Sequence, residues 1–151
     1  MNDRPLERLI DSLQQEPPFR FVDRVLSIES QRRAEGTVTF PGGHAIFEGH
    51  LPGEPLVPGV IVIEALAQLA GLTLQGHSGE KVRGYLAEVG QTRFYRLIHP
   101  GEEIRLEAEV DRAFGDYARF RVKASVAGEL AASGTVTLAR RSGGGGILCG
   151  Q

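Results

Sequence analysis

Residues 58–75, PGVIVIEALAQLAGLTLQ, decide the fold. Pro58 suits the first position of a helix, because its missing N–H would have no partner there in any case. Apolar side chains then surround the whole helix axis, and a helix of this kind is normally buried on nearly all sides. Gly76 follows as a natural stop. The stretch therefore predicts one long buried helix over residues 58–75.

Strand signals flank this helix on both sides. β-branched and aromatic residues dominate the flanking segments. In the clearest of them, YARFRVKASVA (117–127), apolar and polar residues alternate, as in an antiparallel strand with one solvent-exposed face. A short helix is expected over 6–15. The expected strands are 19–29, 33–40, 82–96, 103–114, 117–127 and 130–140. A curved antiparallel sheet of about six strands wrapped around one helix is the natural solution, so the predicted class is α+β.

The charge balance and the composition of the apolar run argue against two function classes. A net charge of −2 does not favour a nucleic-acid binder, which usually carries a basic excess. The N-terminus lacks the continuous apolar core of a signal peptide. The longest apolar run, residues 56–74, contains Glu64 and Gln68 near its centre, and a central acidic residue is costly in lipid. The sequence predicts a cytoplasmic protein without membrane insertion.

A single domain is expected over residues 1–141, followed by a flexible glycine-rich tail at 142–151. The one cysteine, Cys149, lies in this tail, so no intrachain disulfide is possible and nothing indicates secretion. Its place in a loose tail makes Cys149 a poor candidate nucleophile.

The polar residues of the predicted helix share one face. Residues four apart on a helix are neighbours, which places Glu64, Gln68 and Gln75 on one stripe with Gly71 between them. An unpaired carboxylate in apolar surroundings has a raised pKa, and a partly protonated carboxyl group is suited to general acid catalysis. Gln68 is placed to hydrogen-bond Glu64 and fix its orientation. The stripe predicts an acid within an apolar helix.

A base and an oxyanion site are available nearby. His50 precedes the helix by eight residues, and the Pro-Gly pairs at 52–53 and 58–59 are turns that would fold it back toward the helix start. A histidine has a suitable pKa to remove a moderately acidic proton. The free N–H groups of Gly59 and Val60, at the positive end of the helix dipole, would polarise a carbonyl. Together these groups suit proton abstraction next to a carbonyl, followed by loss of a leaving group.

The same histidine and glutamate also have structural interpretations that involve no catalysis. A lone loop histidine is usually a surface residue, and a glutamate in an apolar helix is often partly solvated or at an interface. The spacing H-x3-E-x-H at His44, Glu48 and His50 fits no trusted zinc pattern, so no metal is expected. His77 and His99 look like loop residues without a role.

The segment GHLPGEPLVPGVIVIEALAQLAG (49–71) strongly resembles the signature of the 3-hydroxyacyl-[acyl-carrier-protein] dehydratases of dissociated fatty acid synthesis, which have the hotdog fold. PFRFVDRVLSIE, TRFYRLIHPGEEIRLEAEV and VKASVAGELAASGTVTLAR are similar to the family's first strand, its strand–turn–strand unit and its last hairpin. The likeness covers roughly residues 17–140. It implies dehydration of a (3R)-3-hydroxyacyl thioester to the trans-2-enoyl thioester.

The resemblance also implies roles for single residues. His50 is expected to take the C2 proton, and Glu64 to deliver a proton to the departing hydroxyl. Gly59, with Val60 beside it, is expected to offer a backbone N–H to the thioester carbonyl, while Gln68 supports Glu64. The related dehydratase-isomerases usually carry aspartate at the position of Glu64, which favours dehydration without double-bond migration.

The resemblance implies an assembly and a partner as well. In this family the histidine and the acid of one site come from two subunits, so a homodimer is expected, often as a trimer of dimers. No cofactor is required. The partner is an acidic acyl carrier protein, which needs a local basic patch. Arg93 and Arg96 are the better candidates for it; a solvated strand face is the simpler interpretation of Arg119, Arg121 and Lys123.

Four positions depart from the family pattern. The residues Leu51, Tyr95, Leu97 and His99 replace commoner ones, which leaves acyl chain length and carrier identity undetermined.

Two other functions stay open. A hotdog thioesterase would hydrolyse the thioester with a carboxylate and water. A non-catalytic subunit would bind acyl chains or complete a heterodimer. The combination of His50 and Glu64 argues against both.

Overall fold

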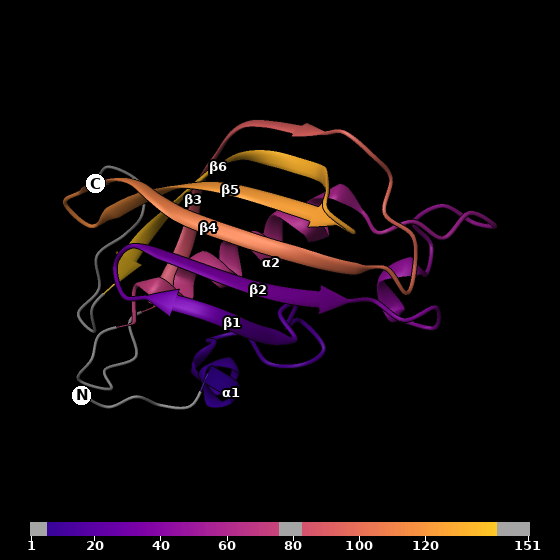
Figure 1. Cartoon of the computed structure of the whole chain (residues 1–151), viewed down its shortest axis with the longest axis horizontal. Helices are drawn as coiled ribbons and strands as arrows, with labels where there is room; N and C mark the ends of the chain where they lie inside the picture. Colours follow the sequence, from indigo (N-terminus) through magenta and orange to yellow (C-terminus); the bar gives the residue numbers. More distant parts are fainter. Residues whose placement is uncertain (1–5, 76–82, 142–151) are drawn as a thin grey trace.

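The computed structural model describes residues 6–75 and 83–141, and it contains a six-stranded antiparallel sheet that curves around one long helix (Figure 1). The strands are β1 (Arg24–Glu29), β2 (Arg33–Thr39), β3 (Arg83–Phe94), β4 (Glu103–Phe114), β5 (Tyr117–Val126) and β6 (Glu129–Arg141). The helices are α1 (Leu6–Leu9) and α2 (Gly59–Thr73), with 3-10 turns η1 (Ile10–Ser12) and η2 (Ala45–Phe47). The order across the sheet is β1-β2-β4-β5-β6-β3. The predicted α+β class and the hotdog arrangement are confirmed.

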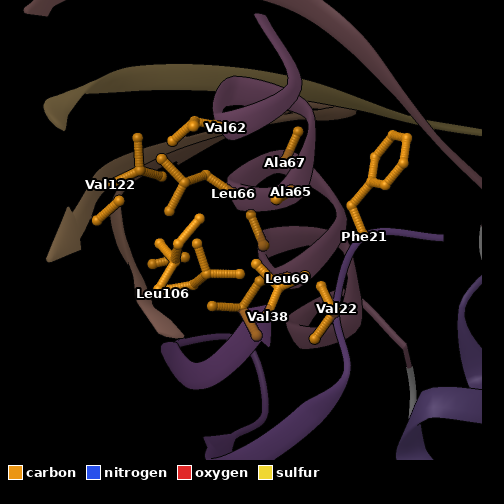
Figure 2. Close-up of a cluster of buried hydrophobic side chains, with 14 of the residues drawn as sticks. Phe21, Val22, Val38, Val62, Ala65, Leu66, Ala67, Leu69, Leu106 and Val122 are labelled. Carbon is orange, nitrogen blue, oxygen red and sulfur yellow. The ribbon is translucent and has the colours of Figure 1, made fainter. Parts of the chain in front are cut away.

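Helix α2 fills the concave side of the sheet. Its side chains Val62, Leu66 and Leu69 are each no more than 2% exposed. Figure 2 shows this cluster of buried side chains, in which α2 residues lie beside Val38, Leu106 and Val122, from β2, β4 and β5. Pro58 is the N-cap, one residue before the helix, rather than the first helical residue. The prediction of burial on nearly all sides fails at Val60, which is 71% exposed.

A glycine allows α2 to approach β2 closely. A Cβ atom at Gly36 would lie 2.6 Å from the carbonyl oxygen of Arg24 and 3.1 Å from Cδ1 of Leu69. Any other residue at this position would push β1 and α2 away from β2. Gly36 therefore helps to set the depth at which the helix sits in the sheet.

The N-terminal segment differs from the sequence prediction in two places. The expected helix over 6–15 is only the short α1 followed by η1, because Leu13 adopts an extended conformation. The expected strand from residue 19 begins at Arg24. The backbone N–H of Phe21 and the carbonyl of Phe19 bond instead to the side chain of Gln68, so these residues do not continue the ladder.

Several predictions concern residues outside the described part of the chain: the stop at Gly76, the loop residue His77, and the tail 142–151 with Cys149. Within the described ranges no helix is long and apolar enough to cross a membrane.

Candidate active site

The predicted polar stripe of α2 lines a hollow that is open to solvent. Glu64, Gln68, Gly71 and Gln75 all face it, as the spacing of four residues predicted. The other lining residues come from the N-terminal segment, α2 and the β3–β6 pair: Leu13, Gln14, Gln15, Ala67, Leu72, Gly84, Leu86 and Leu138. The hollow thus places one carboxylate at the junction of three segments that are far apart in the sequence.

Gln68 holds Glu64 in a fixed orientation. Its Nε2 donates to Oε1 of Glu64 at 3.1 Å and to the carbonyl oxygen of Phe19 at 3.0 Å. Its Oε1 accepts from the backbone N–H of Phe21 at 2.8 Å. Gln68 is only 2% exposed, and a buried amide with all three partners in place has little freedom to turn. The predicted hydrogen bond from Gln68 to Glu64 is confirmed.

Glu64 differs from the expectation of an unpaired buried carboxylate. The side chain is half-buried rather than buried, and it accepts the hydrogen bond from Gln68. The hollow keeps it open to an incoming molecule. Glu64 is therefore a positioned and accessible carboxylate.

His50 lies away from this hollow in the same chain. It is exposed, in the loop between η2 and α2, and this loop extends beyond the ends of the strands (Figure 1). Gly49 and Gly53 flank it with φ values of 71° and 81°, a conformation that favours glycine. Within the described chain, the structure records no contact between His50 and Glu64, so the turns do not fold the base onto the acid of its own chain.

The start of α2 offers two backbone donors. The first N–H groups of a helix have no intrahelical acceptor, and the described chain supplies none to Gly59 or Val60. The ring of Phe94 lies so close that a Cβ at Gly59 would be 2.9 Å from it. Gly59 is half-buried and Val60 is exposed. Two such donors at the positive end of a helix dipole can bind a carbonyl oxygen or an anion.

Strand β3 forms one edge of the sheet. Leu86, Val89 and Phe94 on this strand are 42%, 45% and 50% exposed. Near the start of the edge, the side chain of Gln14 occupies both backbone groups of Gly84, donating to its carbonyl at 2.6 Å and accepting from its N–H at 3.2 Å. Long apolar edge strands favour pairing with another chain.

The candidate basic residues fall into two groups. Arg93 is exposed, and the described chain gives it no carboxylate partner, whereas Arg96 bonds to Glu102 at 2.7 Å and to Glu129 at 3.4 Å. The arginines and the lysine of β5 also face carboxylates of β4. These pairs are Arg119–Asp111, Arg121–Asp111, Arg121–Glu109 and Lys123–Glu107. Arg93 is therefore the cation of the set that is free to meet an acidic partner.

His44 of the H-x3-E-x-H segment has a backbone partner in the structure. His44 caps η2, and its Nδ1 accepts the N–H of Ile46 at 3.1 Å. Among the described residues no three histidine, cysteine or carboxylate side chains gather as metal ligands. Sequence reasoning missed Gln14 and Gln15 as lining residues of the hollow, since only the tertiary fold brings them beside α2.

Solved structures share this architecture at low sequence identity. The dehydratase heterocomplex ApeI:P from Xenorhabdus doucetiae aligns with a TM-score of 0.73 and 17% identity over 89% of this chain and 91% of that chain. A point mutant of the fluoroacetyl-CoA-specific thioesterase FlK aligns with a TM-score of 0.64 and 12% identity, over 76% of this chain and 89% of that chain. These likenesses define the class as a hotdog-fold protein.

Sequence comparison narrows this class. Residues 27–135 match the model of the ApeI-like family, described as ApeI dehydratase. The 3-hydroxyacyl-[acyl-carrier-protein] dehydratase FabZ of Bacillus pumilus is 37% identical over 87% of this chain and 92% of its own. FabZ of Thermomicrobium roseum is 37% identical over 81% of this chain and 83% of its own. The chain belongs to the ApeI-like dehydratase family. The expectation of an enzyme of the dehydratase class is confirmed.

Proposed function

We propose that this enzyme removes water from a (3R)-3-hydroxyacyl thioester carried by acyl carrier protein and yields the trans-2-enoyl thioester. The single observation that carries the proposal is the Glu64 carboxylate, held by Gln68 at an open hollow. The enzyme's relatives, 3-hydroxyacyl-[acyl-carrier-protein] dehydratases, support the same reaction. This chemistry requires one acid and one base, both of which the chain carries.

The proposed steps use these residues in order. His50 removes a proton from C2, and the electron pair forms the C2–C3 double bond. The C3–O bond breaks while Glu64 donates a proton to the hydroxyl group, which leaves as water. The amides of Gly59 and Val60 hold the thioester carbonyl oxygen as negative charge develops on it. No cofactor enters the scheme, since the thioester itself acidifies the C2 proton.

A homodimer completes the site in this proposal. His50 is exposed on a projecting loop, whereas Glu64 lines a hollow that His50 does not reach. Pairing of the apolar β3 edges of two chains would bring the loop of one chain toward the α2 helix of the other. Each of two equivalent sites then takes its base from one chain and its acid from the partner. A trimer of dimers and a cytoplasmic location stay predictions from the sequence.

Mixing two inactive variants tests both the reaction and the sharing of the site. Hydration of a trans-2-enoyl thioester on carrier protein is followed by loss of its ultraviolet absorbance. His50→Ala and Glu64→Gln are each expected to lose activity by roughly 100- to 10,000-fold, the usual contribution of a general acid or base. Unfolded and refolded together, they form mixed dimers that contain one intact site, and activity returns.

Three other outcomes of these assays would contradict the proposal. Mixed variants that stay inactive, although the mixed dimer forms, would place both groups in one chain. A wild-type homodimer that hydrolyses the thioester is a thioesterase. A wild type inert on several chain lengths is the non-catalytic subunit, and coexpression with a second hotdog chain would then restore turnover.

A further inference from the structure

The hollow beside Glu64 is lined by several side-chain amides. A plain alkyl chain would form no hydrogen bonds with them. Besides Glu64, four of its lining residues are glutamines, interspersed with leucines and small residues: Gln14, Gln15, Gln68 and Gln75. The amide of Gln68 already bonds to Glu64 and to the backbone of Phe19 and Phe21. The amide of Gln14 bonds to the backbone of Gly84. A purely apolar ligand would cover the amide of Gln15 without offering it a hydrogen bond, which is costly.

Gln15 and Gln75 are the other two amides that line the hollow. The described chain gives the side-chain amide of Gln15 no hydrogen-bond partner, and this residue is half-buried. Gln75 lies just past the end of α2, on the same stripe as Glu64. Among the described residues that line the hollow, Glu64 is the single ionisable one. Its distal part therefore presents neutral donors and acceptors.

The direction of the substrate follows from the reaction. This step rests on the proposed function, because that function places C3 of the acyl chain at Glu64. The thioester end must lead outward to the carrier, so the hollow beyond Glu64 receives the distal carbons. At about 1.5 Å per helical residue, Gly71 and Gln75 lie roughly 10 and 16 Å along the axis from Glu64. With C–C bonds of about 1.5 Å, these positions are at least roughly seven to eleven bonds from C3.

We infer that the enzyme selects acyl chains that carry a neutral hydrogen-bonding group, a hydroxyl or a carbonyl, in their distal half. Gln15 and Gln75 recognise this group, and the intervening leucines and Gly71 accommodate the hydrocarbon between it and the thioester. A charged carboxylate at the same place would be disfavoured, because the hollow already holds the Glu64 carboxylate and the described part of its lining includes no basic side chain.

The experiment compares three carrier-bound enoyl substrates of equal length that end in methyl, hydroxyl or carboxylate. The ratio of kcat/KM between two substrates on one enzyme cancels differences in folding and in the chemical step. The wild type is expected to favour hydroxyl over methyl by roughly three- to tenfold, the factor that one net hydrogen bond supplies. The carboxylate should be the poorest substrate.

Three variants assign the preference to the hollow, and a fourth serves as the control. Gln15→Leu and Gln75→Leu are each expected to lower the hydroxyl-to-methyl ratio to near one or below, whereas Gln75→Asn, which keeps an amide, should retain part of it. Leu130→Ala, which alters an exposed residue that is not part of the lining, should leave the ratio unchanged. A wild type that is active on all three but prefers methyl, or a ratio that neither leucine variant changes, would refute the inference and leave the proposed function intact. Inactivity on all three refutes the proposed function itself.

Discussion

Gln68 and Glu64 are joined by a hydrogen bond of 3.1 Å across one turn of α2, and Gln68 is itself anchored on the backbone of Phe19 and Phe21. The orientation of the carboxylate therefore depends on a loop that precedes β1, in which Phe21 lies 47 residues before Gln68. The loop, the amide and the acid form one connected unit.

Replacing Gln68 by leucine tests whether this residue positions the Glu64 carboxylate or binds the substrate. The carboxylate keeps its chemistry but loses its fixed orientation, and a misplacement of about 1 Å can cost on the order of 100-fold in rate. We expect kcat to fall by roughly 10- to 100-fold with little change in KM. The free energy of unfolding should fall by about 1–3 kcal/mol, because the Phe21 N–H and the Phe19 carbonyl lose their partner.

Gln68→Glu is the matched variant, since it keeps the size and an acceptor for Phe21 but offers no amide donor to Phe19 and Glu64. It is expected to lower kcat as well. A KM effect with unchanged kcat in both variants would contradict the positioning role.

Much of this arrangement could be predicted from sequence because local rules specify it. Glu64 and Gln68, four residues apart, share one face of α2. Gln75 follows on the same line just past the end of the helix, and the structure brings all three to one hollow. The segment at Phe19 has equally clear strand propensity, yet its backbone bonds to the Gln68 side chain instead of a strand. Propensity cannot reveal a competing partner that lies 47 residues away.

The rest depends on contacts that no local pattern encodes. The sequence predicts Gln14 within a short helix, but its amide occupies the strand edge at Gly84, 70 residues away. In the proposed function His50 is separate from the hollow because two chains share the site, and such sharing has no signature in the sequence of one chain. Only the resemblance to a family suggests it.

Gly36→Ala tests the close approach of α2 to the sheet. The added Cβ would lie 2.6 Å from the Arg24 carbonyl oxygen, and backbone cannot move aside cheaply. We expect a loss of about 1–3 kcal/mol in the free energy of unfolding, as for other overpacked sites, measured by urea denaturation. Gly42→Ala is the control, because a Cβ there meets no atom within 4 Å. Equal stabilities of the two variants would contradict the packing argument.

Acid should destabilise the protein partly through Glu102. The hydrogen bond from the His99 backbone N–H, followed by that from Arg96, lowers the pKa of this carboxyl group below its ordinary value of 4.5. The unfolded chain therefore binds more protons near this pH, so the stabilisation is present above about pH 4.5 and is lost as the pH falls toward the folded-state pKa.

Glu102→Gln removes this linkage, and the melting temperature should fall less steeply between about pH 6 and pH 3.5 than in the wild type. Glu103→Gln is the control, since the described chain gives Glu103 no ion pair. Parallel pH profiles for the wild type and Glu102→Gln would contradict the assignment.

The β3 edge should control assembly. Val89→Lys places a charge on an exposed apolar position of this edge, and lysine on an edge strand opposes pairing with another chain. We expect a folded monomer by sedimentation, with its secondary structure retained and its activity lost. Leu130→Lys alters a residue of similar exposure on β6, which is not an edge strand, and should stay dimeric and active. A dimeric Val89→Lys enzyme would locate the interface elsewhere.

Arg93 should act on the carrier protein rather than on the chemistry. It is exposed and free of carboxylate partners in the described chain, whereas Arg121 is held by Asp111 and Glu109. Opposite charges across an interface chiefly raise the rate of association and weaken with salt. Arg93→Gln should therefore raise KM for the carrier-bound substrate by roughly fivefold, about 1 kcal/mol, with kcat nearly unchanged. The effect should vanish with a small soluble thioester and shrink at high ionic strength, and Arg121→Gln should show neither change. An equal loss on both substrates would instead place Arg93 within the catalytic site.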